Sequence, residues 1–411
     1  MSIATNLTKL QNDISSAYTT IGTKGGTIPQ NKNTDNLSTA INSIPSGGTP
    51  EPEEKDVNFY DFEGTRLYSY TKTEFLQLSA MPEVPAKTGL TSQGWTYSLT
   101  NAQNYVTEYG QLEIGTQYDT SHHGINMYLY LNKYVLNGVT LTLTTSGNAT
   151  INWGDGGTTN IPAVSGQSYG HNYEQAGNYK ISIIPEGNTT ITLVQNFFSG
   201  EHRVRTKKIE IGTQCILSGA RVLYDYNIVE SISIPTKTDI LTADNQYLIC
   251  YNRCLKCFIL PQGVSDTAQY MVQECDYLQH LIFSDTYVNN YFRINNTFAK
   301  NNSSLKNITL PKTNAFYGNS FNSCSNIIKL VIPKETTTIN GSAFISMKYT
   351  KVFDFTHLTS VPTLQNVNAF NDIYSYKIVV PDNLYNTWKS TNNWSNSAIA
   401  NNIVKASDFN L

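Results

Sequence analysis

The chain has 411 residues and a net charge of −3, and only 14% of its residues are charged. A chain of this length holds two to four domains of ordinary size. It carries no basic field that would attract nucleic acid or an anionic membrane. It also lacks an apolar run of the ~20 residues that a transmembrane helix needs.

The composition has two explanations. Tyrosine (27 residues) is almost as frequent as lysine and arginine together (28), and asparagine is abundant. Such a polar, uncharged surface with many aromatic residues suits β-rich extracellular binding proteins, but an AT-rich genome would produce the same bias. The six cysteines are scattered and favour small buried thiols in a reduced chain over a disulfide framework. Cys254 and Cys257 lack a second ligand pair at zinc spacing, so we expect no metal and no cofactor.

The first segment, residues 1–45, is predicted to be helical. Apolar residues recur in residues 3–21 at steps of 4, 3, 4, 3 and 4, which indicates one seam along a helix. The seam consists of Ile3, Leu7, Leu10, Ile14, Ala17 and Ile21. Because so short a helix is marginal alone, we expect it to form a homo-oligomer or to pack on another structure. The alternative is an amphipathic helix that lies on its own domain.

A second short helix is expected after the possible N-cap at 33–35. Residues 46–56 are rich in Gly, Ser, Pro and Glu and are predicted to be a linker. Residues 57–125 form a small α+β module: two strands flank Gly64, and a helix from Leu99 to Tyr109 ends at Gly110. Trp95 is predicted to anchor its core.

Residues 126–200 alternate like strands, with Gly, Asn and Pro every eight to twelve residues, which predicts a β-sandwich. Trp153 with the following Gly-Asp-Gly, then His171-Asn-Tyr173 and Gly-Asn-Tyr-Lys-Ile, resembles the polycystic kidney disease (PKD) domain. The resemblance implies that Trp153, Asp155, His171 and Tyr173 build the fold. Domains of that family usually act as spacers or adhesive modules and occasionally bind glycans.

From residue 201 to 381 one short phrase recurs eight times, as in Leu305-Lys-Asn-Ile-Thr-Leu-Pro311. Its central apolar residue recurs at steps of 23, 26, 23, 27, 22, 23 and 25 residues, which is typical of a solenoid. These anchors are Ile209, Ile232, Phe258, Leu281, Ile308, Leu330, Phe353 and Ile378. The residue two positions after each anchor is also apolar, so each repeat is predicted to contribute a strand with two inward side chains.

An additional pattern precedes the phrase, as in Phe321-Asn-Ser-Cys324 and Ala343-Phe344. Together the two patterns resemble the BspA-like leucine-rich repeat, whose unit reads approximately A-F-x-x-C-x-x-L-x-x-I-x-L-P. The tail, residues 382–411, resembles the helical cap of such arrays, because a solenoid must cover its last coil. Trp388 and Trp394 are therefore interpreted as cap residues, with a glycan platform as the alternative.

The residue between the two inward positions is also apolar in several repeats, namely Ile259, Ile282, Val331 and Val379, with Thr309 in a fifth. An apolar row on the outer face of a sheet is unusual for a free monomer. We therefore consider a face that packs against a sister subunit or a partner, with cover by the same coil as the alternative.

Ligand contacts are expected on the irregular connectors. The tentative ligand-binding residues are Tyr287, Tyr291, Phe292, Phe316 and Tyr317. Their rings would stack on sugars while asparagine amides bond the hydroxyl groups. The alternative is that these aromatic residues are buried in the coil.

The sequence contains no nucleophile elbow, zinc-protease motif, phosphate-binding loop or dinucleotide fingerprint, so we expect no enzymatic activity. The predicted fold is mainly β and multi-domain: an N-terminal helical segment, an α+β module, a PKD-like β-sandwich, and a BspA-like solenoid with a helical cap.

The pattern F-Y-D-x-x-G-x-x-L-Y-S-Y, P-x-x-P, G-L-T-x-Q-G-W within 57–125 resembles a module of tail and fibre proteins of phages that infect gut Firmicutes. The chain start lacks the basic residues and apolar centre of a signal peptide, which is ordinary for a virion component. The resemblance implies a tail-tip or fibre receptor-binding protein, usually trimeric, attached to other virion proteins by its N-terminal segment and binding a host-surface glycan or protein. The alternatives are a head decoration protein without a receptor role and a bacterial surface adhesin.

Overall fold

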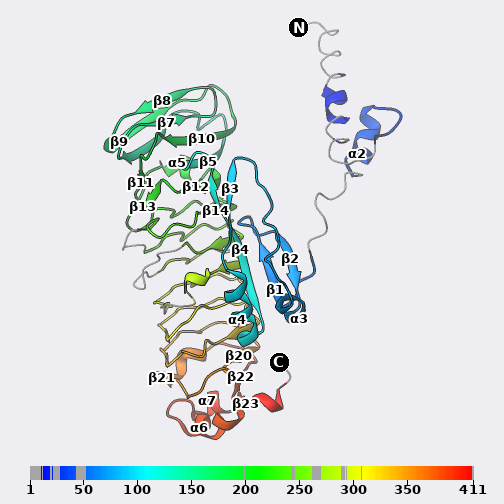
Figure 1. Ribbon diagram of the computed structural model, residues 1–411, viewed down its shortest axis with the longest axis vertical. Helices are drawn as coiled ribbons and strands as arrows, with labels where there is room; N and C mark the ends of the chain where they lie inside the picture. The colour runs from blue at the N-terminus through cyan, green and yellow to red at the C-terminus, as the bar shows by residue number, and fades with distance from the viewer. Residues whose placement is uncertain are drawn as a thin grey trace. The chain divides into compact units, whose positions relative to one another are not determined.

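The computed structural model describes residues 11, 13–18, 21, 28–42, 52–198, 200–241, 246–261, 270–287, 292, 294–306 and 308–409. The chain divides into two units, Met1–Glu53 and Glu54–Leu411. The module, the β-sandwich, the repeats and the cap therefore lie within one unit (Figure 1). The fold of this unit is mainly β.

The N-terminal unit contains a helical stretch at 13–18 and helix α2 (Thr34–Asn42). The Asn33 side chain accepts a hydrogen bond from the Asn36 backbone and caps α2, as expected. Tyr18 and Ile21 are buried together with Ala40, and Ile14 packs against them. The described part of the seam thus packs within its own unit, in agreement with the alternative interpretation. Ile3, Leu7 and Leu10 lie outside the described residues.

The α+β module has a four-stranded sheet in the order β2-β1-β4-β3. Its elements are β1 (Val57–Tyr60), β2 (Arg66–Tyr70), α3 (Lys72–Leu76), β3 (Leu90–Trp95), α4 (Leu99–Tyr109) and β4 (Leu112–Thr120). The predicted hairpin around Gly64 is present, because β1 and β2 pair antiparallel. Helix α4 has the predicted bounds and ends at Gly110, whose φ of 79° is in the left-handed region that favours glycine. Strand β4 was not predicted.

The β-sandwich has one sheet in the order β14-β12-β5-β10-β7-β8 and another in the order β13-β11-β6-β9. Its elements are β5 (Ile125–Leu131), β6 (Val139–Thr145), β7 (Ala149–Asn152), β8 (Thr158–Ile161), β9 (Val164–His171), β10 (Gly177–Pro185), β11 (Ile191–Leu193) and α5 (Gly200–Arg203). Strands β12 and β14 belong to the first repeats, so the sandwich sheet continues directly into them. Both share one apolar core.

The four sandwich residues that we singled out have structural contacts. Trp153 is buried, and the His171 ring stacks on it with a centroid separation of 4.8 Å. His171 Nε2 is 2.7 Å from Asp155 Oδ2, and the Tyr173 hydroxyl donates a hydrogen bond to the Trp153 carbonyl. These contacts hold the turn between β7 and β8 against β9.

The repeats form a stack of coils whose main strands pair in parallel. The strands are β12 (Thr206–Ile211), β14 (Ser231–Ser233), β15 (Cys257–Ile259), β16 (His280–Ile282), β18 (Lys329–Val331), β20 (Val352–Asp354), β22 (Lys377–Val380) and β23 (Ile403–Lys405). The predicted anchors are opposite one another in this pairing: Ile209 pairs with Ile232, Phe258 with Leu281, and Leu330 with Phe353. All eight anchors are buried.

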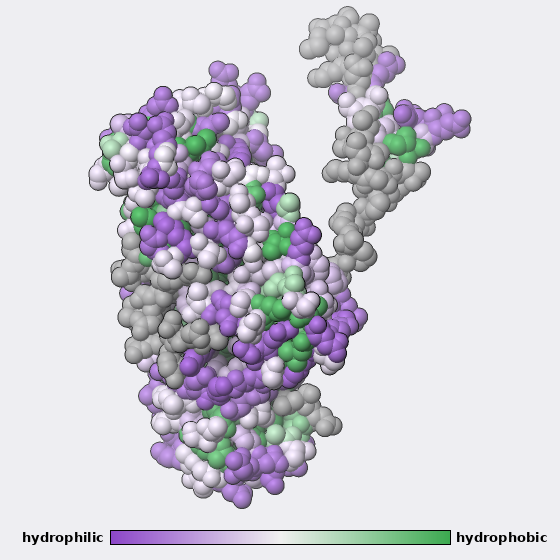
Figure 2. All heavy atoms as spheres, viewed as in Figure 1, coloured by the Kyte–Doolittle hydropathy of each residue, from purple (hydrophilic) through white to green (hydrophobic). Residues whose placement is uncertain are grey.

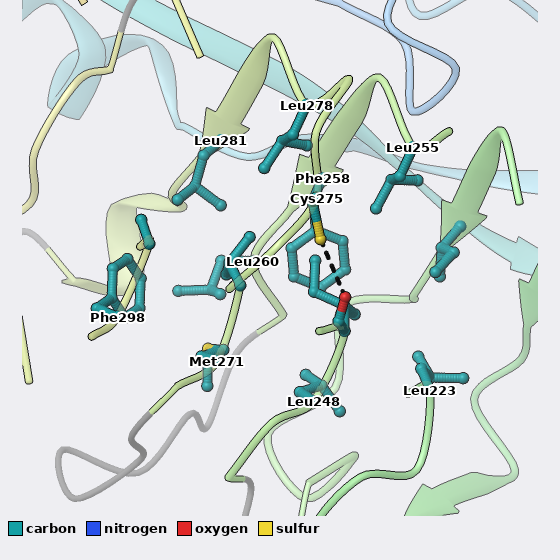
Figure 3. Packing of buried hydrophobic residues seen from close by; sticks show 14 of the residues in the cluster. Leu223, Leu248, Leu255, Phe258, Leu260, Met271, Cys275, Leu278, Leu281 and Phe298 are labelled. Atoms are coloured by element: carbon teal, nitrogen blue, oxygen red, sulfur yellow. Dashed lines mark hydrogen bonds between the residues drawn. The ribbon is translucent and has the colours of Figure 1, made fainter. Parts of the chain in front are cut away.

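Shorter elements complete the coils and were not predicted. They are β13 (Cys215–Leu217), β17 (Ala315–Phe316), β19 (Thr338–Ile339), β21 (Thr363–Leu364), η1 (Asp285–Tyr287) and η2 (Val367–Phe370). Strands β17, β19 and β21 form their own parallel sheet. Each coil therefore bends between two sheets, and the apolar side chains fill the space between them (Figure 3).

In four successive coils, one position three residues before the phrase binds the coil to the coil before it. It holds Asn252, Cys275, Asn302 and Cys324, whereas the repeats on either side have Tyr226 and Met347 there. Its side chains donate hydrogen bonds to main-chain carbonyls one coil back: Asn252 to Leu223, Cys275 to Ile249, Asn302 to Val272, and Cys324 to Ala299. Figure 3 marks the Cys275 bond with a dashed line. Burial raises the pKa of both thiols to about 12, so they keep the proton that they donate.

Both ends of the stack are covered. At the N-terminal end, β12 pairs antiparallel with β5 of the sandwich. At the other end lie η3 (Asp382–Leu384), α6 (Tyr385–Ser390), α7 (Ser397–Ala400), β23 and η4 (Ala406–Asp408). Trp388 and Trp394 are buried against Phe355, which agrees with a cap and not with a glycan platform. Ile403, 25 residues after Ile378, pairs with it and adds one more strand in the repeat register.

We expect Asn302→Ala to lower the free energy of unfolding by about 3 kcal/mol, because it leaves the Val272 carbonyl and the Cys275 amide buried without their partner. Urea unfolding measures the change. Asn326→Ala, an exposed asparagine of the next repeat, is the matched control. Equal stability of the two variants would contradict the role of Asn302.

Candidate binding surface

The outer face of the main repeat sheet is covered by the module of the same chain. Strand β4 is buried along its whole length (Figure 1). Leu112 and Ile114 point into the module core. The odd-numbered residues 113–119 point the other way and contact successive coils, because side chains alternate along a strand.

The contacts of β4 follow the stack coil by coil. Asp119 accepts hydrogen bonds from the Thr213 backbone and hydroxyl, and Gln117 accepts one from the Thr236 hydroxyl. The backbone amide of Glu113 donates to the Thr309 hydroxyl at 3.0 Å. The sequence-predicted outward position Thr309 is thus bonded to β4.

Gly115 lies opposite the apolar part of the outward row. A Cβ at this position would be 2.6 Å from Ile259 Cδ1 and 3.5 Å from Ile282 Cδ1. Ile259 and Ile282 are buried in a cluster that also contains Tyr60, Phe62 and Tyr118 of the module. Glycine therefore permits the close approach of β4 to the two isoleucines.

These contacts change the interpretation of the outward row. Ile259 and Ile282 pack against the module and not against a sister subunit, so neither is a free partner face. Val331 and Val379 are buried as well. For Ile259 and Ile282 the cover comes from the module of the same chain, and not from the same coil as the alternative interpretation stated. On the coloured part of the visible face in Figure 2, hydrophobic residues occur in separate groups among polar ones.

A buried acid–base pair lies within this contact. Glu113 Oε1 is 3.0 Å from His280 Nδ1, and the His280 ring stacks on Tyr60 at 4.0 Å between centroids. Burial raises the pKa of the Glu113 carboxyl above its usual range, against the opposing effect of His280. The pair fixes the register of β4 on the coils.

The predicted ligand-binding aromatic residues are mostly in the core. Tyr287, Phe292 and Phe316 are buried, and the Tyr287 hydroxyl donates to the Pro261 carbonyl. Their rings are therefore core side chains of the coils and are not available to stack on a sugar. Tyr317 is half-buried, and Tyr291 lies outside the described residues.

Other aromatic residues gather where the coils turn. In six consecutive coils, two residues four positions apart have a left-handed backbone, with φ between 56° and 65°. The pairs are Arg221/Asp225, Tyr247/Tyr251, Tyr270/Glu274, Thr297/Asn301, Asn319/Ser323 and Ser342/Ser346. We call the row of these turns, with the three residues that follow each pair and with residues 372–374 of the next coil, where Asp372 is also left-handed, the turn edge. Backbone hydrogen bonds connect the turns of successive coils, as from Tyr251 to Gln273.

Tyrosine is energetically unfavourable at these left-handed turn positions. The left-handed conformation costs about 1–2 kcal/mol for a residue with a Cβ, and Asn and Asp tolerate it best. Yet Tyr247, Tyr251 and Tyr270 occupy it. The Tyr247 and Tyr270 rings stack in parallel at 4.6 Å, and the Arg221 guanidinium lies 4.8 Å from the Tyr247 ring centre. These contacts partly offset the backbone strain.

The Tyr247 and Tyr270 rings are half-buried, and each covers one face of the other. Burial, followed by the Glu274 carboxylate, raises the pKa of Tyr251, so its hydroxyl stays a donor. Free ring faces occur elsewhere on the turn edge. Tyr277 and Tyr349 follow the left-handed residues Glu274 and Ser346, and Tyr374 follows Asp372; their exposed fractions are 61%, 51% and 60%.

The turn edge could have been found in the sequence. Its left-handed residues lie eight and four positions before each phrase, in the variable part of the repeat. Small polar residues fill seven of the twelve left-handed positions, and tyrosine fills three of them.

A metal centre and a membrane-spanning helix are two further features that the described residues could hold. No three histidine, cysteine, aspartate or glutamate side chains there are placed to hold a metal ion. Nor does any helix in that part of the chain have the length and apolar character needed to cross a bilayer.

The coils pair in parallel and repeat every 22–27 residues. Each has a Leu-like phrase that points inward, and four of them have a Cys or Asn that donates a hydrogen bond to the preceding coil. These features define a leucine-rich-repeat protein. The model of the BspA type leucine rich repeat region matches six copies, at residues 171–296 and 288–398. The matched region is more than half of the chain, which therefore belongs to the BspA-type leucine-rich-repeat family. A search among curated proteins found no match.

The contact of β4 with the coils predicts coupled mutations. Gly115→Ala should lower the free energy of unfolding by about 1–3 kcal/mol, since the added methyl group overpacks against Ile259. Ile259→Ala makes room for it, so the double variant should lose less than the sum of the single changes. Urea unfolding of the unchanged protein, the two single variants and the double variant gives the free energies of this double-mutant cycle. Gly200→Ala, where a Cβ meets no atom within 4 Å, is the control; an additive cycle would contradict the contact.

Proposed function

We propose that this protein is a surface adhesin that binds an extended glycan along the turn edge. The observation that carries the proposal is the gathering of exposed tyrosines on this one edge, three of them more than half exposed. Tyrosine offers a large rigid contact surface together with a hydroxyl group, which suits recognition of polar ligands at low entropic cost.

The remaining groups on the turn edge fit a neutral, hydroxyl-rich ligand. Between the two groups of tyrosines lie amide and hydroxyl side chains such as Asn301, Asn319 and Ser323. The charged groups there balance, with Arg221, Arg253, Lys300 and Lys348 against Asp225, Glu274, Asp276 and Asp372. Two pairs form within the edge: Lys348 is 3.9 Å from Asp372, and Arg253 is 3.9 Å from Asp276. An edge with no net charge favours an uncharged polymer over a charged one.

The mechanism is binding without turnover. Rings such as those of Tyr349 and Tyr374, 6.0 Å apart between centroids, would take sugar faces. The hydroxyl groups of the stacked tyrosines and the asparagine amides would bond sugar hydroxyls. Because successive coils repeat about every 4.8 Å, such contacts recur along the edge and suit a polymer. We expect no enzymatic activity, no cofactor and no nucleic-acid partner.

We propose that this adhesin is a component of a phage tail tip or tail fibre. The support is the resemblance of 57–125 to modules of phage tail proteins and the separate N-terminal unit, which would attach the protein to other virion proteins and form a trimer. The PKD-like interpretation of the sandwich, with the Gly-Asp-Gly turn and its packed aromatic residues, suits a spacer. Head decoration and a bacterial surface adhesin are the alternatives.

Tyrosine substitutions on the turn edge separate binding from stability. The pair Tyr247→Asn/Tyr270→Asn removes strain of about 1–2 kcal/mol per residue and loses a ring pair worth about 0.5–1.5 kcal/mol, so stability should be retained or rise. Binding to cell-wall polysaccharide, measured by biolayer interferometry, should fall in this variant and in Tyr349→Ser/Tyr374→Ser. Tyr134→Ser, which changes an exposed tyrosine of the sandwich, is the control. Full binding by both double variants would refute the turn edge as the site.

Electron microscopy with an antibody against this protein tests whether it is part of a phage tail. Labelled phage should carry the antibody at the tail. Label on the head would support decoration instead, and label only on uninfected bacteria would support a bacterial adhesin.

A further inference from the structure

Three neighbouring strands place a lysine, an asparagine and a glutamate together where the sandwich sheet continues into the first repeat. Glu210 of β12 pairs with Asn126 of β5, which pairs in turn with Ser182 of β10. Lys208 of β12 and Tyr128 of β5 form the next row of the sheet. These five side chains share one face, because residues two positions apart on a strand point the same way. The other face of the same strands packs in the apolar core.

The glutamate connects the lysine amine to the asparagine amide. Lys208 Nζ is 3.0 Å from Glu210 Oε1, and Asn126 Nδ2 donates a hydrogen bond to Glu210 Oε2 at 3.0 Å. The Tyr128 hydroxyl also donates to Oε2 and holds the carboxylate in place. Lys208 and Asn126 are diagonal neighbours across the two strands, and Cβ atoms related in this way lie about 7–8 Å apart. A lysine side chain is long enough to bring its amine to the amide carbon over this distance.

The carbonyl of the same amide is polarised from the other side. Asn126 Oδ1 accepts hydrogen bonds from the Ser182 hydroxyl at 2.7 Å and from His122 Nε2 at 2.9 Å. His122 Nε2 carries a proton, because Nδ1 accepts the Gly124 backbone amide at 3.1 Å. Two donors at this oxygen withdraw electrons from the amide carbon. They also stabilise the negative charge that the oxygen gains when the carbon is attacked.

The surroundings favour the amine over water as the attacking group. Asn126 and Glu210 are buried, and Lys208 Nζ lies 5.0 Å from the Phe62 ring centre. Burial lowers the pKa of Lys208, but its hydrogen bonds to Glu63 and Glu210 outweigh that effect and raise the pKa. The amine can therefore react only while its proton resides on a carboxylate, so we expect a slow reaction that occurs once in each chain.

We propose that Lys208 and Asn126 form an isopeptide bond, with Glu210 as the catalytic acid and base. Glu210 accepts a proton from the Lys208 ammonium, and the electron pair of the free amine forms a bond to Asn126 Cγ. Glu210 then passes this proton to Nδ2. The Cγ–Nδ2 bond breaks, and its electron pair leaves with ammonia. The ammonia takes up a second proton from Nζ through Glu210 and departs as ammonium, so the step needs no further reactant.

The bond would fasten the sandwich to the repeat stack. It joins β5 to β12 covalently and closes a loop of about 80 residues, which restricts the unfolded chain as a disulfide does. A pulling force between the two ends of the chain would then pass through the bond and would not unfold the sandwich strands between residues 126 and 208. This role does not depend on whether the turn edge binds a glycan.

Mass spectrometry of the denatured full-length chain tests the bond after incubation at about pH 9, which favours deprotonation of lysine relative to neutral pH. The mass should fall by that of one ammonia molecule, and trypsin should release a branched peptide that contains both Asn126 and Lys208. Lys208→Arg should abolish both signals. Glu210→Gln should slow the reaction at least about a hundredfold, because it removes the group that transfers the protons. Lys180→Arg is the matched control: Lys180 flanks Tyr128 from β10, and the variant should react as the unchanged protein does.

Contrary results are equally clear. An unchanged mass, or loss of ammonia without the branched peptide, would overturn the proposal. Loss of ammonia that persists in Lys208→Arg would come from cyclisation of an asparagine and would contradict it as well. The branched peptide is sought in the unchanged chain, so this result does not depend on the folding of any variant. Once the bond has formed, the melting temperature should exceed that of Lys208→Arg by on the order of 10 °C; equal melting temperatures would exclude the fastening role.

Discussion

The hydrogen bonding of each coil to its neighbours is the constraint on which the rest of the structure depends. A single coil cannot bury its own apolar residues or satisfy its own main chain, so it needs a coil on either side. Main-chain pairing meets part of this need, and the side chains of Asn252, Cys275, Asn302 and Cys324 meet another part. The ends of the stack must then be closed. The sandwich strand β5 closes one end and the tryptophan-containing cap closes the other.

Docking of the module on the main sheet decides which surfaces remain for function. Strand β4 covers Ile259, Ile282 and Thr309, so this part of the outer face is not free for a partner. At the turn edge, backbone hydrogen bonds connect the turns of successive coils. In the proposed function, the phrase would provide stability and the turns would provide specificity.

Much of the fold was accessible from the sequence, and part of the site was not. The inward residues, the bounds of α4 and the buried cap tryptophans follow from local periodicity and capping residues. The module strand β4 was missed because its odd-numbered residues, Glu113 to Asp119, are mostly polar and look solvent-exposed. They are buried against hydroxyl groups, an imidazole and two isoleucines of the coils. Tyr287, Phe292 and Phe316 were misjudged for the opposite reason: connector residues can still point into the core.

By itself the sequence determined the repeat register and the fold family, because a strand phrase at a fixed period can bury its apolar residues in only one way. It also placed Tyr247, Tyr251 and Tyr270 in the two columns eight and four positions before the phrase, where seven of the twelve residues are small and polar. Only the tertiary structure decided which outward face is covered and which is free. The bond between Glu113 and Thr309 joins residues 196 positions apart, and no local pattern encodes such a contact. The position of the proposed binding surface follows from these distant contacts.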